Sequence, residues 1–125
     1  MDEIDVSKYI GKGYRENSNG PDFYDCYSLF ISIQRDIGKN IIDFRHDAKS
    51  REERKKAIDE GKRDPCFEKI EKPLAGCGVI LYYNDVPQHI GVYIGKGKVI
   101  HATYDRGVVI DELRTLKVEG FYKVK

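Results

Sequence analysis

The sequence has no tryptophan, a single methionine and only three cysteines. An odd number of cysteines, with no secretion signal before them, does not make the disulfide framework of a small secreted domain. No apolar run approaches the ~20 residues of a membrane-spanning helix, and the N-terminus, Met1 to Glu3, is acidic, unlike a signal peptide. We therefore expect a chain made in the cytoplasm, with no signal peptide and no membrane span.

An excess of charge of one sign is missing too. The 22 Lys and Arg residues nearly balance the 21 Asp and Glu residues, which leaves a formal net charge of +1. Because nucleic-acid-binding proteins show a basic excess or a basic stripe, this balance argues against a nucleic-acid partner. At about 100–150 residues per domain, a length of 125 residues predicts one domain, residues 1–125.

The clearest helical signal covers residues 25–37. Asp25 is a good N-cap residue, and Gly38 stands where a glycine often ends a helix. Cys26 falls in the first turn. The apolar residues of this segment recur at helical spacing: Leu29, Phe30, Ile33 and Ile37.

Residues 45–72 have a different composition, because ten basic and eight acidic residues leave few apolar ones. A capping-box pattern at Ser50 and a glycine at Gly61 predict a solvated helix between them. A loop through Pro65 and Pro73 follows in this interpretation. We expect a charged, partly helical insertion outside the core sheet and beside the substrate cleft.

Short apolar or alternating runs, separated by turn residues, follow from Gly78 to the C-terminus. They predict strands at 79–83, 89–94, 98–103, 108–110 and 121–124. The order of one helix followed by an antiparallel meander predicts an α+β fold, with the helix packed on a sheet of four to six strands.

Cys26, His89 and His101 are the residues most suited to catalysis. A thiol at a helix N-terminus faces the positive end of the helix dipole, which favours the thiolate. A cysteine nucleophile also needs a base, and the base needs a third group to orient it. The alternative is that Cys26 is a small buried side chain and that each histidine is an ordinary strand residue. Neither the cysteines nor the histidines have the spacing of a zinc site.

The turn between the two histidine strands decides whether the imidazoles can meet. An even-numbered turn centred on Lys96 and Gly97 would place His101 opposite Val92, on the face away from His89. A three-residue turn at 95–97 would instead place His101 opposite Gly91, on the same face as His89. We predict the three-residue turn, with Gly97 in the left-handed conformation.

Several motifs occur in an order that resembles one family. Residues 25–30, Asp-Cys-Tyr-Ser-Leu-Phe, are similar to the nucleophile motif of the NlpC-type cell-wall cysteine peptidases, which are small papain-like hydrolases. Residues 89–95, His-Ile-Gly-Val-Tyr-Ile-Gly, resemble the motif of the general base, and residues 99–102, Val-Ile-His-Ala, that of the third polar residue. The loop at 11–15 and the Gly-Phe-Tyr sequence at 120–122 look most like the variants of phage tail proteins.

The resemblance assigns roles to five residues. Cys26 would be the nucleophile, His89 the general base and then acid, and His101 the residue that orients His89. Tyr14 and Asp25 would contribute to oxyanion stabilisation or substrate binding, with the backbone N–H of Cys26 as a further oxyanion donor. The resemblance implies no metal and no other cofactor.

The resemblance also implies a function, a substrate and a place of action. The family usually hydrolyses peptidoglycan stem peptides between γ-D-glutamate and the next diamino acid, through an acyl-enzyme. We expect action at the bacterial cell wall, as a virion component or after lysis or secretion, with a phage tail or other delivery protein as a partner. Alternatives are an N-acetylmuramoyl-L-alanine amidase or an acyltransferase with the same site, and a phage tail or assembly component with a mainly structural role. The sequence departs from the family pattern at Ser28, where glycine is usual.

Overall fold

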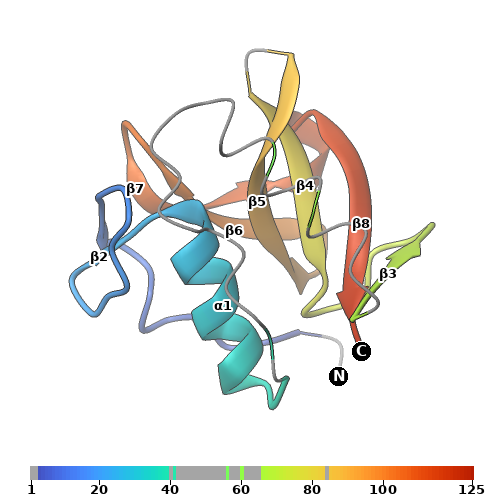
Figure 1. Cartoon of the computed structure of the whole chain (residues 1–125), viewed down its shortest axis with the longest axis horizontal. Coiled ribbons are helices and arrows are strands. Elements are labelled where there is room, and N and C mark those ends of the chain that lie inside the picture. The colour runs from blue at the N-terminus through green and yellow to red at the C-terminus, as the bar shows by residue number, and fades with distance from the viewer. Residues whose placement is uncertain (1–2, 40, 42–55, 57–59, 61–65, 84) are drawn as a thin grey trace.

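A helix and an antiparallel sheet form the framework of the protein (Figure 1). The computed structural model describes residues 3–39, 41, 56, 60, 66–83 and 85–125. The elements are α1 (Cys26–Asp36), a short 3-10 helix (Leu113–Thr115) and the strands β1 (Gly13–Tyr14), β2 (Phe23–Tyr24), β3 (Phe67–Ile70), β4 (Gly78–Tyr83), β5 (Val86–Gly95), β6 (Lys98–Thr103), β7 (Gly107–Glu112) and β8 (Val118–Val124). Among these residues, no helix is both long and apolar enough to cross a membrane.

Helix α1 forms where the apolar spacing predicts it. Asp25 is its N-cap, Ile37 its C-cap, and Gly38 follows with a φ of +86°, the left-handed conformation that glycine tolerates best. The apolar face of the helix, including Leu29, Phe30 and Ile33, is almost completely buried. It packs against β5 and β6 in the main core cluster of the protein.

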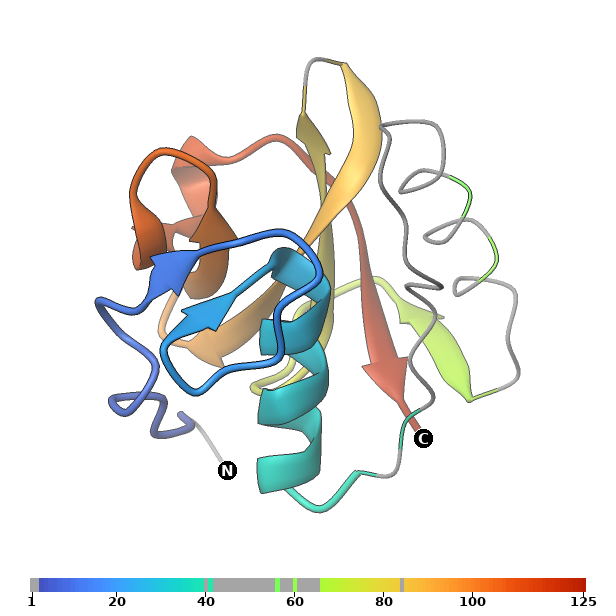
Figure 2. The ribbon, with the colours of Figure 1, turned by 60° about the vertical axis from the view of Figure 1, so that its left-hand side comes forward.

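The main sheet has six strands in the order β3-β8-β4-β5-β6-β7, and every neighbouring pair is antiparallel. The predicted α+β class, with a sheet of four to six strands, is therefore confirmed. Strands β1 and β2 form a separate parallel pair. Figure 2 shows this pair beside the first turn of α1.

One part of the predicted insertion belongs to the sheet, so its placement outside the sheet is wrong. Strand β3, expected to be loop, pairs with β8 from Phe67 to Ile70 and forms an edge of the sheet. Phe67 packs against the core, and its ring stacks on Phe30 at a centroid distance of 6.2 Å. Two charged residues in the middle of this short strand hide its apolar pattern. The helix predicted from Ser50 to Gly61 falls almost entirely outside the described residues.

The N-terminal segment contacts β5 and then β7 before it enters β1. The N–H of Ile4 donates to the carbonyl of Ile94 over 3.1 Å, and the side chains of Ile4, Val6 and Tyr9 are buried. Further along, Val108 of β7 exchanges backbone hydrogen bonds with this segment, which covers the outer edge of β7. The segment then enters β1, which ends at Tyr14.

Candidate active site

The first turn of α1 holds Cys26 in a fixed position. One oxygen of the Asp25 carboxylate accepts the N–H of Ser28 over 2.8 Å, and the other accepts the N–H of Asn17 over 2.9 Å. The Ser28 hydroxyl in turn accepts the N–H of Asp25 over 3.0 Å, which completes a capping box. The serine that departs from the family pattern thus helps to cap the helix. Cys26 itself is not in a disulfide, and its side chain is mostly buried.

Strands β5 and β6 bring the two histidines to one face of the sheet. Val92 pairs with Ile100, so His101 lies opposite Gly91 in the predicted register. The predicted length of the turn is wrong, however, because Gly95 pairs with Lys98 and leaves a two-residue turn. A bulge between Tyr93 and Gly95 then shifts the pairing by one residue, so that the strands beyond it have the predicted register. Gly97 does have a positive φ, +75°.

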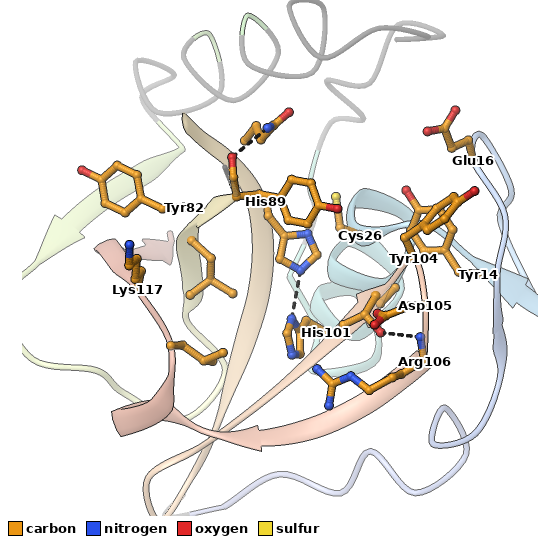
Figure 3. A pocket seen from close by; sticks show the side chains of 16 residues that line it. Tyr14, Glu16, Cys26, Tyr82, His89, His101, Tyr104, Asp105, Arg106 and Lys117 are labelled. Atoms are coloured by element: carbon orange, nitrogen blue, oxygen red, sulfur yellow. Dashed lines mark hydrogen bonds between the residues drawn. The ribbon is translucent and has the colours of Figure 1, made fainter. Parts of the chain in front are cut away.

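The two imidazoles are in direct contact. His89 Nε2 lies 2.9 Å from His101 Nδ1, and the ring planes are tilted by 60°. Because His89 uses Nε2 for this contact, its Nδ1 remains for a group in the pocket. Figure 3 shows Cys26 and the two histidines together among the side chains that line one pocket.

Two further residues extend the site beyond His101, and neither was predicted from the sequence. Asp111 of β7 places Oδ2 2.7 Å from His101 Nε2, and Arg106 holds both oxygens of the same carboxylate at 3.1 and 2.8 Å. The register explains the contact, because His101 pairs with Val109 and Asp111 is therefore its diagonal neighbour. In the sequence, Asp111 follows three apolar residues and shares the face of Val109, but the register that places it beside His101 is not visible there.

Burial and charge set the protonation of this group. Burial lowers the pKa of His89 below its usual value, and the neighbouring His101 lowers it further. Burial also lowers the pKa of His101, although Asp111 opposes the effect. The hydrogen bonds from Arg106 are the main cause that lowers the pKa of Asp111 to about 2. These shifts favour the neutral form of both histidines and the ionised form of Asp111 in neutral solution.

The site opens into a pocket of about 450 Å³. Besides the cysteine and the histidines, several aromatic and charged residues line it: Tyr14, Glu16, Tyr82, Tyr104, Asp105 and Lys117. Figure 3 shows Tyr82 and Lys117 on one side of His89, and Tyr14, Tyr104, Glu16 and Asp105 on the other. The structure thus brings Tyr14 to the same pocket as Cys26. Asp25 is not among the residues that line this pocket; its carboxylate caps α1 and also accepts the N–H of Asn17 in the preceding loop.

This combination of fold and site agrees with the comparison of the sequence with known families. The sequence model of the NlpC/P60 family matches residues 11–123. The chain belongs to the NlpC/P60 family. This is a family of cysteine peptidases that includes peptidoglycan hydrolases, and the matched range contains every residue of the site described above.

Solved structures show the same NlpC/P60 fold. NlpC1 from Trichomonas vaginalis has a TM-score of 0.69 at 18% identity, over 94% of this chain and 42% of that protein. The NlpC/p60 domain of the peptidoglycan hydrolase SagA has a TM-score of 0.66 at 16% identity, over 94% of this chain and 92% of that domain. A similar-to-lipoprotein NLP/P60 protein from Staphylococcus aureus has a TM-score of 0.62 at 18% identity, over 98% of this chain and 43% of that protein.

This NlpC/P60 chain spans less than half the length of the Trichomonas vaginalis and Staphylococcus aureus proteins. No curated protein sequence matches it. At such low identity the structural likeness concerns the fold, and the roles of individual residues rest on the geometry of the site. The resemblance to phage tail variants gains no support from these comparisons.

Proposed function

We propose that the protein is a cysteine peptidase that hydrolyses peptidoglycan stem peptides at the bond between γ-D-glutamate and the next diamino acid. The observation that carries the proposal is the contact between His89 Nε2 and His101 Nδ1, in a pocket that Cys26 also lines. A nucleophile at a helix start, a base and a group that orients the base are the three components that covalent acyl transfer requires.

In the proposed reaction His89 Nδ1 takes the proton of the Cys26 thiol. The thiolate sulfur attacks the amide carbonyl, and the negative charge that develops on the oxygen is stabilised by the Cys26 N–H and the Tyr14 hydroxyl. The C–N bond then breaks as the imidazolium of His89 returns its proton to the leaving amine. Water, deprotonated by His89, hydrolyses the thioester and regenerates the thiol.

The charges around the pocket support a substrate with groups of both signs. Lys117 lies on one side of His89, while Glu16 and Asp105 lie on the other (Figure 3). Stem peptides carry free carboxylates and amines close to the scissile bond, so opposite charges at the two ends of the pocket would select their orientation. Tyr82 and Tyr104 are both exposed and offer apolar surface beside these charges.

The test is to incubate the protein with purified muropeptides and to identify the products by mass spectrometry. We expect cleavage between γ-D-glutamate and the diamino acid, and none with Cys26→Ala. Release of the whole stem peptide from the muramoyl group would instead identify an amidase, and transfer to an added amine would identify an acyltransferase. Intact muropeptides under all conditions would overturn the proposal and favour the structural alternative.

The proposed place of action follows from the substrate. Peptidoglycan lies outside the cytoplasmic membrane, so the protein would act at the bacterial cell wall, with delivery by a phage tail or another partner protein. Fractionation of cells or virions, followed by detection of the chain with an antibody, tests this part of the proposal. Detection in the cytoplasmic fraction alone, throughout growth and lysis, would contradict it.

A further inference from the structure

Asp111 lies behind His101, Arg106 pairs with it from the wall of the pocket, and the proposed attack on the substrate uses neither of them. Asp111 Oδ2 lies 2.7 Å from His101 Nε2. Arg106, in the turn between β6 and β7, donates to both oxygens of the Asp111 carboxylate. Three side chains on neighbouring strands therefore form a line: His89, then His101, then Asp111. Each contact in this series is one hydrogen bond between two ring nitrogens or between a ring nitrogen and a carboxylate oxygen. The protonation state of Asp111 therefore decides which nitrogen of each histidine carries the proton.

Asp111 is ionised and therefore only accepts hydrogen bonds. His101 must then carry a proton on Nε2, and a neutral imidazole has no second proton for Nδ1. A bare Nδ1 accepts, so the proton between the two rings belongs to His89 Nε2. By the same rule the neutral ring of His89 has a bare Nδ1, which is the atom available to a group in the pocket. The lowered pKa of each histidine favours these neutral forms.

We propose that Asp111, held by Arg106, is a positioning residue that fixes the tautomers of both histidines, so that His89 presents a basic nitrogen to Cys26. With the opposite tautomer of His101, the His101 Nδ1–H would donate to His89, and His89 would direct an N–H toward the thiol. Such a ring cannot accept the thiol proton. The inference rests on the proposed function for the role of Cys26, but its statement about the tautomers concerns the resting protein alone.

The direct test is the nitrogen spectrum of the wild-type protein without substrate. Long-range proton–nitrogen correlation in a 15N-labelled sample distinguishes a protonated from a bare ring nitrogen. Spectra of His89→Gln and His101→Gln assign the signals. We expect Nε2–H and bare Nδ1 in both rings near neutral pH. A proton on Nδ1 of either ring, or a doubly protonated His101, would overturn the proposal.

The second test is the Asp111→Ala variant, with Glu112→Ala as its matched control. Glu112 is the next residue, carries the same charge and pairs with the exposed Arg114 instead of a histidine. We expect Asp111→Ala to populate both tautomers of His101 and to lower kcat/KM about 10- to 100-fold, the effect that outer partners of metal-bound histidines have. Glu112→Ala should keep both the tautomers and the turnover of the wild type.

These measurements separate the inference from the proposed function. The expected tautomers in a protein that cleaves no muropeptide would overturn the proposed function and leave the inference intact. Wild-type tautomers in Asp111→Ala, together with undiminished cleavage, would overturn the inference and leave the proposed function intact. If Asp111→Ala does not fold, as its backbone amide spectrum would show, the wild-type spectrum alone decides.

Discussion

Cys26, Cys66 and Cys77 are all reduced cysteines outside any disulfide, but their surroundings differ. Cys77 is buried just before β4, and burial raises the pKa of its thiol. Cys66 is partly exposed just before β3. Cys26 lies in the first helical turn and lines the same pocket as His89. The helix N-terminus favours the thiolate, the reactive form, and the basic nitrogen of His89 can take the thiol proton as the sulfur reacts.

We therefore expect iodoacetamide to label Cys26 faster than Cys66 and Cys77 near neutral pH. The rates are measured by peptide mass spectrometry over a time course, and His89→Ala should slow the labelling of Cys26 alone. Denatured protein serves as the control, because its three thiols should react at similar rates. Equal labelling of all three thiols in the folded protein would contradict the assignment of Cys26 as nucleophile.

The lowered pKa values of the histidines also make stability depend on pH. Below the ordinary histidine pKa of 6.5, the unfolded chain binds protons that folded His89 and His101 do not bind. The free energy of unfolding therefore falls as the solution is acidified below this value, by at most about 1.4 kcal/mol per pH unit for each histidine. Asp111 lowers the free energy of unfolding further as the pH falls from its ordinary pKa of 3.8 to its lowered pKa of about 2.

Urea unfolding at a series of pH values from 8 to 4 measures this dependence. The midpoint should fall on acidification below about 6.5. A His89→Asn variant, which has a neutral side chain at all these values, should show a flatter dependence than the wild type. Equal slopes for the two proteins would mean that His89 does not titrate differently in the folded and unfolded states.

At the scale of elements, the β5–β6 hairpin decides whether the histidines meet. A Cβ on Gly91 would lie 2.8 Å from Val99 Cγ1 and 3.0 Å from the carbonyl oxygen of Ile100. It would also lie 3.2 Å from the Cβ of His101. The glycine thus permits the close approach of β6 that holds His101 against His89. Gly97, in the turn of the same hairpin, has no atom within 4 Å of such a Cβ, and only its positive φ favours glycine there.

Gly91→Ala should therefore harm both stability and catalysis. We expect a loss of about 1–3 kcal/mol in unfolding free energy from overpacking, and a loss of about 10- to 100-fold in kcat from displacement of His101. Gly97→Ala is the matched control, and should lose about 1–2 kcal/mol from backbone strain with unchanged kcat. Equal turnover of the two folded variants would show that the approach at Gly91 is not needed for the site.

The elements differ in how well their sequences predict them. Helix α1 and strands β4 to β6 could be predicted because burial on one or both faces imposes a clear apolar period. Strand β3 could not be predicted, because an edge strand needs few apolar residues. Of its four residues, only Phe67 packs against the core of the protein. The bulge in β5 could not be predicted either, because the turn at Lys96 and Gly97 is compatible with two registers and packing selects between them.

At the scale of the whole molecule, the site is assembled from segments that are far apart in the sequence. Cys26, His89 and His101 could be predicted, because each lies in a motif with a chemical reason for its residue types. Asp111 and Arg106 belong to the next strand and its turn, and their approach to His101 depends on a register that the sequence of β7 does not state. Long-range pairing, more than local propensity, therefore limits what the sequence alone reveals about the site.

The N-terminal segment ties these distant parts together, with Tyr9 as its main anchor. Tyr9 is only 3% exposed, its ring meets Tyr24 edge-on at 5.4 Å between centroids, and its hydroxyl donates to Asp36 of α1. The next residue, Ile10, is 50% exposed. The segment continues from there along β7 and carries Tyr14 into the pocket.

Tyr9→Ala should lower the free energy of unfolding by about 3–5 kcal/mol, as for other large aromatic side chains removed from a core. Ile10→Ala, the matched control, should change it by less than about 0.5 kcal/mol. Tyr9→Phe keeps the ring and removes only the hydrogen bond to Asp36, so it should lower the free energy of unfolding by about 1 kcal/mol. Urea unfolding of the three variants gives the comparison. If Tyr9→Ala were no more harmful than Ile10→Ala, the segment would lie on the sheet without stabilising it. Other contacts, such as those with β2 and Tyr104, would then have to hold Tyr14 in the pocket.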